Sequence, residues 1–255
     1  MLAKRVIPTM LCRGRTLVKG KAFAGDRSIG HVLQAAQVHA RRGVDELCIL
    51  DISATAEGRG PDLAMVEELS DGCHIPITVG GGVRSLKDID ALLRAGADKV
   101  AICTAAYEID ELVPDAKDRF GRQAIVVVVE HKGRQSSYRN GDIHLRLIQD
   151  DGWSPMSPVA TAQWMEKRGA GEILLQSIDR DGTMEGYDLD LIREVSAATS
   201  IPVIVSGGCG GYADMLAAIQ AGADAVAAGA VFQYTDCTPK GAARYLKDHN
   251  VCARL

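Results

Sequence analysis

The sequence contains no CxxC pair, although it has seven cysteines. An odd number of cysteines without that pair favours neither a disulfide framework nor a zinc ribbon. We therefore expect reduced thiols and a cytoplasmic location. The residues concerned are Cys12, Cys48, Cys73, Cys103, Cys209, Cys237 and Cys252.

A large charge of one sign and a long apolar run are also missing. The formal net charge is only -4, so the chain has no electrostatic footprint for nucleic acid or an anionic membrane. No stretch approaches the roughly 18 apolar residues of a membrane span, and MLAKRVIPTML is followed by no cleavage-type spacing. We expect small molecules or other proteins as partners.

The histidines are not spaced as metal ligands. His39, His74, His131, His144 and His249 are most simply surface or turn residues. We predict no metal site and no other cofactor.

What the sequence does contain is a regular alternation of short apolar runs with stretches of helical period. This pattern is typical of βα units around a parallel sheet. No linker divides the 255 residues, so we predict one domain over 1–255. Eight is the strand number of a (β/α)8 (TIM) barrel. The candidate strands span 5–11, 45–52, 76–81, 99–103, 124–130, 172–178, 202–208 and 225–229.

An internal repeat supports the barrel. A shift of 126 residues places 46–104 on 172–230 without a gap, with about twenty identities in 59 positions. Two similar half-barrels, roughly 1–122 and 123–255, explain this repeat with few assumptions. The same logic makes Leu11 and Glu130 equivalent strand ends.

Each half supplies a glycine-rich turn after a strand. In the first half, Gly81 and Gly82 are followed one strand later by Cys103 and Thr104. In the second half, Gly208 precedes Gly229 and Ala230. Small residues let a phosphate approach converging backbone N–H groups, although a tight βα turn alone also needs glycine. Two such turns at one spacing favour a substrate phosphorylated at both ends.

The stretch SIDRDGTMEGYD at 177–188 is the most distinctive in the chain. Asp179, Arg180, Asp181, Gly182 and Thr183 place charge, turn and hydroxyl groups in one βα loop. We interpret the loop as part of a site. The alternative is a structural loop held by its own ion pair.

Together, several motifs resemble the cyclase (HisF-type) subunit of imidazole glycerol phosphate synthase over essentially the whole chain. They include DEL-ILDI, IPITVGGGV, AGADKVAI-TAA, KRGAGEILL-SIDRDGT-GYD and IPVI-SGG. The resemblance implies a (β/α)8 barrel of the ribulose-phosphate-binding type and a lyase-class cyclase. It also implies a bis-phosphorylated ribulosyl substrate and ammonia made by a partner glutaminase of the HisH type.

The resemblance assigns roles to the glycine-rich turns. It implies one phosphate at Gly81, Gly82, Cys103 and Thr104, and the other at Asp181, Gly182, Gly208, Gly229 and Ala230. The family usually has Asn at position 103 and Ser at position 230, so two side-chain donors are missing here.

The general acid and base of the family are two aspartates at the ends of the first and fifth strands. The matching residues here are Leu11 and Glu130. Leu transfers no proton, and Glu reaches about one methylene further than Asp. Thr9 lies deeper on the same side, and Cys12 faces the other side. Asp51, at the end of the second strand, is retained as a further catalytic candidate, but one acid on a different strand does not replace the pair. The substitutions predict that cyclase activity is lost or weak.

At the other end of the barrel, the family's four gate residues match without exception. In the family they form a salt-bridge ring through which ammonia enters, and Asp98 matches a position facing the glutaminase. Two cations and two anions in one barrel mouth are costly unless they pair. A stabilising plug is the alternative interpretation. The four residues are Arg5, Glu46, Lys99 and Glu172.

Three hypotheses follow. The first is a subunit that receives ammonia from a glutaminase and delivers it to another acceptor, as in paralogues that serve sugar amidation for surface polysaccharide (lipopolysaccharide) biosynthesis with a separate sugar amidotransferase. The second is a working cyclase of histidine biosynthesis. The third is a scaffold that only binds a glutaminase.

Overall fold

Strands and helices alternate along the chain of the computed structural model, which describes residues 3–138, 143–144, 146–149 and 152–254. The eight predicted barrel strands are all present, with ends that differ from the predicted ones by one or two residues. The first and fifth run two residues further than predicted, because their ends pair with antiparallel strands that follow them in the chain. They are β1 (Arg5–Arg13), β4 (Leu47–Asp51), β5 (Ile77–Gly80), β6 (Lys99–Ile102), β7 (Ile125–Lys132), β12 (Glu172–Ser177), β13 (Val203–Ser206) and β14 (Ala225–Ala228).

These strands close into a (β/α)8 barrel. Parallel neighbours follow the order β12, β13, β14, β1, β4, β5, β6, β7, and a further pairing of β7 with β12 completes the circle. A closed barrel leaves no open edge among these eight strands. The fold class predicted from the sequence is confirmed.

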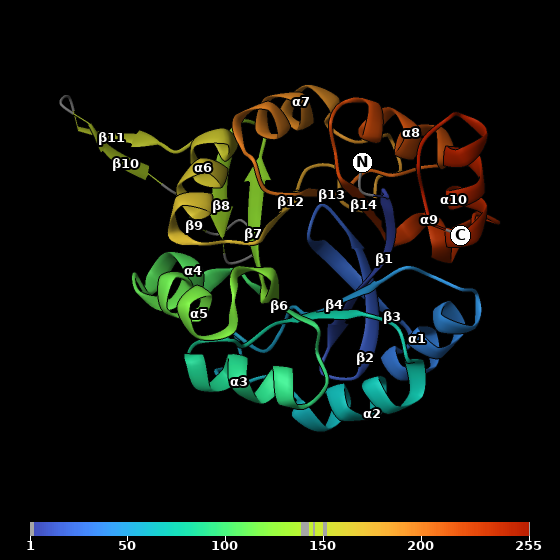
Figure 1. Cartoon of the computed structure of the whole chain (residues 1–255), viewed down its shortest axis with the longest axis horizontal. Coiled ribbons are helices and arrows are strands. Elements are labelled where there is room, and N and C mark those ends of the chain that lie inside the picture. Colours follow the sequence, from blue (N-terminus) through green and yellow to red (C-terminus); the bar gives the residue numbers. More distant parts are fainter. Residues whose placement is uncertain (1–2, 139–142, 145, 150–151, 255) are drawn as a thin grey trace.

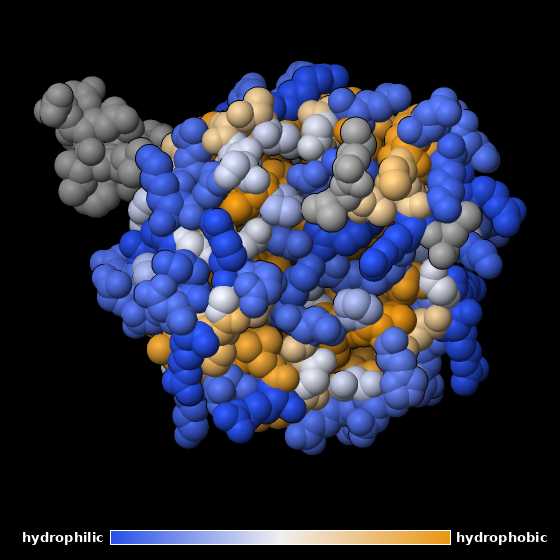
Figure 2. Space-filling view, in the orientation of Figure 1, coloured by the Kyte–Doolittle hydropathy of each residue, from blue (hydrophilic) through white to orange (hydrophobic). Residues whose placement is uncertain are grey.

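Helices cover the outside of the barrel (Figure 1). Hydrophilic side chains occupy most of the outer rim, and hydrophobic ones show between them (Figure 2). The helices are α1 (Val32–Arg41), α2 (Leu63–Cys73), α3 (Leu86–Arg94), α4 (Thr104–Glu108), α5 (Leu112–Phe120), α6 (Pro158–Arg168), α7 (Leu189–Ala198), α8 (Tyr212–Gln220), α9 (Ala230–Tyr234) and α10 (Pro239–Asp248), with a short 3₁₀ turn at Arg122–Ala124.

The core has two parts because strand side chains alternate between the faces of the sheet. The larger cluster lies between strands and helices and includes Val6, Met10 and Cys12. A smaller cluster fills the barrel interior and includes Ile7 and Leu11. This alternation confirms that Cys12 faces away from Leu11.

Residues related by the 126-residue shift play the same structural roles. Asp62 caps α2 by accepting a hydrogen bond from Met65 N at 3.0 Å, and Asp188 caps α7 through Leu191 N at 3.1 Å. An N-cap carboxylate satisfies a backbone donor that the helix leaves unpaired. The matched caps explain why the two halves of the chain share polar residues as well as core residues.

Antiparallel arms add to the barrel. β2 (Thr16–Lys21) and β3 (Ala24–His31) form a hairpin after β1, which the sequence analysis did not predict. The stretch 131–158 lies partly outside the described residues. Its described parts include β8 (Gln135–Tyr138), β9 (Ile143–His144), β10 (Arg146–Gln149) and β11 (Gly152–Pro155), and the β10–β11 pair projects away from the barrel (Figure 1).

A buried histidine makes the stability of this fold depend on pH. The sequence predicted His39 as a surface or turn residue, but it lies in α1 and is buried edge-on to the ring of Phe232, with 6.3 Å between the ring centroids. His131, predicted in the same way, is buried in β7. Burial, and secondarily Arg42, lowers the pKa of His39 to about 4. In the unfolded chain histidine binds a proton near pH 6.5, so between about pH 6.5 and 4 the unfolded state binds more protons.

We predict that folding stability falls by up to about 3 kcal/mol as the pH drops through that window. His39→Leu removes the titrating group and should flatten the fall. Urea unfolding at pH 7 and pH 4.5, with the parent chain measured alongside, tests this. An equal loss in both proteins would contradict it.

Candidate functional site

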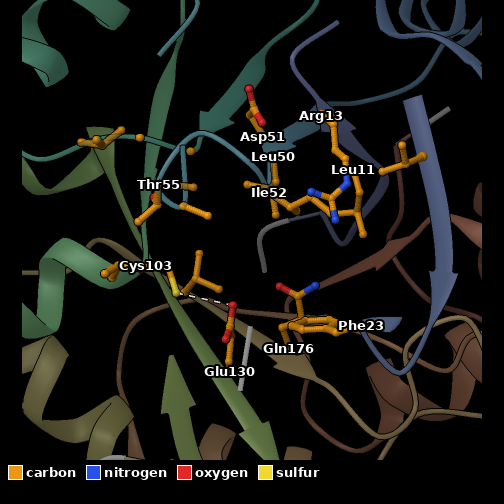
Figure 3. Close-up of a pocket in the computed structure, with 18 of the residues that line it drawn as sticks. Leu11, Arg13, Phe23, Leu50, Asp51, Ile52, Thr55, Cys103, Glu130 and Gln176 are labelled. Atoms are coloured by element: carbon orange, nitrogen blue, oxygen red, sulfur yellow. Dashed lines mark hydrogen bonds between the residues drawn. The ribbon is translucent and has the colours of Figure 1, made fainter. Parts of the chain in front are cut away.

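The carboxyl ends of the barrel strands surround a cavity of about 700 Å³. Its lining comes from strand ends and the loops after them, where functional sites of such barrels lie. Leu11, Leu50 and Ile52 lie across the cavity from Glu130 and Gln176 (Figure 3). The fold therefore brings both predicted catalytic positions, Leu11 and Glu130, to one cavity.

Leu11 is held in apolar surroundings. It is 7% exposed and is paired in register with Leu50 on β4 and with Val18 on β2. An ionised carboxylate there would be poorly solvated. The wall around Leu11 is thus built for an apolar side chain.

Glu130 carries the buried carboxylate opposite this wall. It ends the inward row of β7 and is 6% exposed. The Cys103 thiol donates a hydrogen bond to Glu130 Oε1, with Sγ 3.6 Å away. Cys103 and Glu130, the two positions at which the resemblance implies a substituted asparagine and a substituted aspartate, therefore contact each other.

Asp51 also lines the cavity, but its oxygens are engaged in the loop that follows β4. One oxygen accepts hydrogen bonds from Ser53 N and Ser53 Oγ, each at 3.0 Å. The other forms an ion pair with Arg59 Nη2 at 2.7 Å. These contacts hold the loop that follows β4.

The first glycine-rich site faces the large cavity. Gly81, Gly82, Cys103 and Thr104 all line it. Gly81 has φ +111°, and a Cβ there would lie 2.3 Å from the Asp51 carbonyl oxygen. Only glycine permits this close approach of two backbones.

The second site surrounds a smaller cavity of about 20 Å³. Asp181, Gly182, Gly208, Gly229 and Ala230 all line it, so the fold unites residues from three loops. The distinctive 177–188 loop contributes here. Its Arg180 donates to the Gly186 carbonyl at 3.0 Å, so among the described contacts the loop is held through its backbone and not by its own ion pair.

Sequence reasoning missed Lys19 in the second site. The β2–β3 hairpin carries its ammonium group beside Gly229, where an added Cβ would lie 1.9 Å from Lys19 Nζ. The hairpin is anchored there by Ala22 N, which donates to the Asp181 carbonyl at 2.8 Å. Burial lowers the pKa of Lys19, and the Asp181 carboxylate opposes that shift. The sequence signal that could have found Lys19 is a lysine placed between the apolar Val18 and Gly20.

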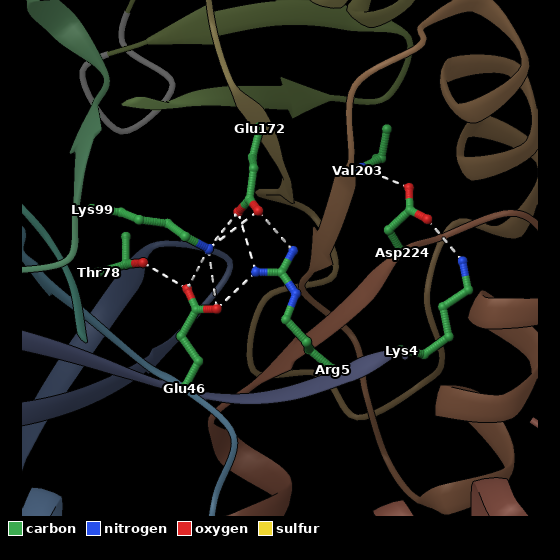
Figure 4. A network of polar contacts seen from close by, with 8 residues as sticks. All are labelled: Lys4, Arg5, Glu46, Thr78, Lys99, Glu172, Val203 and Asp224. Carbon is green, nitrogen blue, oxygen red and sulfur yellow. Dashed lines mark hydrogen bonds and ion pairs between the residues drawn. The ribbon is translucent and has the colours of Figure 1, made fainter. Parts of the chain in front are cut away.

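At the opposite end of the barrel, the four predicted gate residues form one closed ring of ion pairs (Figure 4). Arg5 contacts Glu46 at 2.7 Å and Glu172 at 3.0 Å. Lys99 contacts the same two carboxylates at 3.2 and 3.0 Å. Each charge therefore has two partners of opposite sign.

Glu46 is the most buried member of the ring. It is 3% exposed and also accepts a hydrogen bond from Thr78 Oγ1 at 2.7 Å. Burial alone would raise its pKa, but Arg5 and Lys99 outweigh that effect and lower the pKa below its usual range. Glu46 is therefore a carboxylate at neutral pH, and the ring is held together by mutual compensation.

Asp98, the predicted partner-facing residue, is exposed at the same end. Its Oδ2 accepts a hydrogen bond from Ile77 N at 2.9 Å. Asp224, its equivalent in the repeat, accepts from Val203 N at 3.1 Å and also pairs with Lys4 at 2.8 Å. Both aspartates tie neighbouring strands together, but no cation in the described part of the chain pairs with Asp98.

The described residues contain no group of three or more His, Cys, Asp or Glu side chains arranged to hold a metal. All seven cysteines are free thiols. No helix among the described residues is both long and apolar enough to cross a membrane.

The fold and the cavity define a (β/α)8 barrel with glycine-rich candidate anion sites and a buried polar ring at opposite ends. Comparison with known proteins gives the family: residues 5–238 match the family described as histidine biosynthesis protein, and the chain belongs to it.

Two relatives show where in the family the chain lies. It is 38% identical to the imidazole glycerol phosphate synthase subunit HisF of Dictyoglomus thermophilum and 41% identical to the protein of the same name from Bacillus cereus. Each comparison covers 100% of both chains. The chain is thus HisF-like over its full length.

We predict that Lys99→Met destabilises the fold by about 2–4 kcal/mol at pH 7, because it leaves two buried carboxylates with one cation. Urea unfolding measures the change. Lys4→Met is the matched control: its ion pair with Asp224 lies at the same end but is 20% and 43% exposed, and its loss should cost under about 1 kcal/mol. Equal losses in the two variants would contradict the compensated ring.

Proposed function

We propose that this chain is the synthase subunit of a glutamine amidotransferase complex. In this proposal a HisH-like glutaminase docks at the ring end of the barrel, and its ammonia passes through the barrel to an acceptor in the cavity. The observation that carries the proposal is Leu11, an apolar residue where the family resemblance places a proton-transferring acid. In this proposal the subunit conducts ammonia but does not carry out efficient cyclisation.

The interior above the ring supports passage of a neutral molecule. Ile7, Cys48 and Leu174 occupy the first inward positions beyond Arg5, Glu46 and Glu172. Ammonia crosses an apolar layer far more easily than ammonium, because an isolated charge there is poorly solvated. We infer that the ring admits ammonia and the apolar layer excludes its cation.

The cavity supports the loss of cyclase chemistry. Imidazole ring closure needs protons moved at defined places. Leu11 offers none, and Asp51 is bound by Ser53 and Arg59. Glu130 is left as a single carboxylate opposite an apolar wall, and we propose that its role is to position the acceptor.

The acceptor follows from the two glycine-rich sites. We propose a phosphorylated small molecule, with a phosphate at the second site beside Lys19 and the first site available to another anionic or polar group. The sugar amidation of surface polysaccharide biosynthesis, with a separate sugar amidotransferase, suits the stretches VIPTMLC and RDGTMEGYDLDLI. This assignment is finer than the family membership and rests on those motifs.

A second candidate is a functional cyclase in histidine biosynthesis. The names of the two relatives and the retained carboxylate of Glu130 favour it. A scaffold that binds a glutaminase without passing ammonia is the third, and the ring and cavity together argue against it.

We predict that the parent chain, supplied with the bis-phosphorylated ribulosyl substrate and ammonium salt, turns over at least about 10³-fold more slowly than the Bacillus cereus relative, because an acid–base pair contributes this much or more. Leu11→Asp with Glu130→Asp should regain about tenfold or more. Product formation is followed directly.

Leu11→Asn with Glu130→Asp is the control, since the amide at position 11 adds polarity there without supplying a general acid. Parent turnover equal to that of the relative would overturn the proposal. A folded double variant that binds the substrate but stays inert would contradict our account of the defect.

We also predict that the chain stimulates glutamine hydrolysis by its cognate glutaminase. Asp98→Asn keeps a hydrogen-bond acceptor for Ile77 N but removes the charge. It should raise about tenfold the concentration of this chain that gives half-maximal stimulation of the glutaminase. Asp224→Asn, the equivalent change in the other half, is the control and should have little effect. Absence of stimulation by the parent chain would argue against docking.

A further inference from the structure

The Glu130 side chain carries a buried carboxylate into the large cavity from the end of β7 (Figure 3). Its register partner on the neighbouring strand β12 is Gln176, whose side chain lines the same cavity. Side chains at paired positions of neighbouring strands lie on one face of the sheet, so the carboxylate and the amide are adjacent. Together they offer a ligand one charged and one neutral acceptor group.

The chemistry of an ionised carboxylate selects the kind of ligand group that it can hold. It accepts hydrogen bonds and donates none, so it pairs with groups that carry N–H or O–H donors. The Cys103 thiol already donates to Glu130 Oε1, with Sγ 3.6 Å away, and this contact holds the carboxylate in place. A second anionic group placed against Glu130 would be repelled.

The lining of the large cavity is more acidic than basic. Among the described residues it holds five carboxylates and two arginines, and neither lysine nor histidine. On the side formed by α4 and β7, the lining includes Glu108 and Glu130 and no cation. That side favours a ligand group of positive charge. The other three acids each face a cation of the chain: Asp26 with Arg13, Asp51 with Arg59, and Asp181 with Lys19.

The wall opposite Glu130 strengthens this preference because it is apolar. Leu11 and Leu50 are buried and lie across the cavity from the carboxylate (Figure 3). A ligand that fills the space between the two walls displaces water from Glu130. Attraction between opposite charges is stronger where the effective dielectric constant is lower, so a cation is held more firmly here than at the exposed rim.

The large cavity adjoins the second glycine-rich site, because Leu11, Gln176 and Asp181 line both cavities. A ligand with its phosphate in the second site can therefore extend to Glu130. Transfer of ammonia gives such a ligand a new nitrogen. If that nitrogen is of the amine or amidine kind it is protonated at pH 7, as the lysine and arginine side chains are, whereas a carboxamide stays neutral.

We propose that Glu130, with Gln176 beside it, binds a cationic nitrogen group of the ligand that carries N–H donors, of the ammonium or amidinium class. The Cys103 thiol positions the carboxylate, and the wall of Leu11 and Leu50 keeps water from it when the cavity is filled. The inference rests on the proposed function, since it takes the transferred ammonia to become this nitrogen. It assigns a cationic product and excludes a neutral carboxamide.

The test uses the full chain alone, with acetamidinium chloride and methylammonium chloride as probes. The side-chain amide of Gln176 and the backbone amide of Cys103 are followed by ¹H–¹⁵N NMR during each titration. Acetamide is the neutral counterpart of acetamidinium and has nearly the same shape. We expect saturable shifts for at least one cation, with a midpoint about tenfold or more below that of acetamide. The cation with the lower midpoint identifies the class.

Glu130→Gln removes the charge but keeps an acceptor for the Cys103 thiol, and it should raise the midpoint of the cation about tenfold. Glu130→Asp keeps the charge and should retain the preference for the cation over acetamide. Glu185→Gln is the matched control, because Glu185 is an exposed glutamate in the loop after β12 that lines neither cavity. Its loss should leave the titration unchanged.

Equal midpoints for both cations and acetamide in the parent chain would overturn the site, and this comparison does not depend on any variant. The same shifts with sodium chloride, or an unchanged midpoint in folded Glu130→Gln, would also overturn it. Neither a glutaminase nor ammonia is present in these titrations. Failure of this site is therefore distinguished from failure of the proposed function, which the stimulation of glutamine hydrolysis measures separately.

Discussion

The ring of Arg5, Glu46, Lys99 and Glu172 is the interaction on which the remaining structure depends. Buried charges are tolerated only when each meets its opposite, so the four strands that carry them have one acceptable register. Strand side chains repeat with period two, and this register therefore determines every inward residue above the ring. Leu11, Leu50, Cys103 and Gln176 face the cavity for this reason.

The internal repeat separates scaffold from site. Asp62 and Asp188 cap equivalent helices, and Asp98 and Asp224 tie equivalent strand pairs. The inward residues differ between the halves: Leu50 corresponds to Gln176, and Cys103 to Gly229. The second half thereby gains a small polar cavity beside Lys19, while the first half keeps an apolar wall against a large one. One duplicated framework thus supports two chemically different sides of the mouth.

Much of the barrel could be read from the sequence, because its strands are short apolar runs that alternate with stretches of helical period. The two glycine-rich turns were also predictable, since a parallel barrel brings all strand ends of one kind to one face. The ring was predicted through the family resemblance. Lys19 was missed because its burial results from a hairpin that folds back onto the second half. The engagement of Asp51 was missed because Arg59 lies eight residues further on, in a loop whose course no periodicity indicates.

The sequence by itself determined the fold class, the family and the apolar identity of the first strand's end. These follow from local periodicity, from duplicated spacing and from residue type, none of which needs coordinates. Only the tertiary structure decided that Leu11 packs between Val18 and Leu50, that Cys103 contacts Glu130, and that Thr9, Lys19, Gln176 and Ser206 line one small cavity. Those contacts join residues up to about two hundred positions apart, and barrel closure is the physical event that brings them within reach of one another.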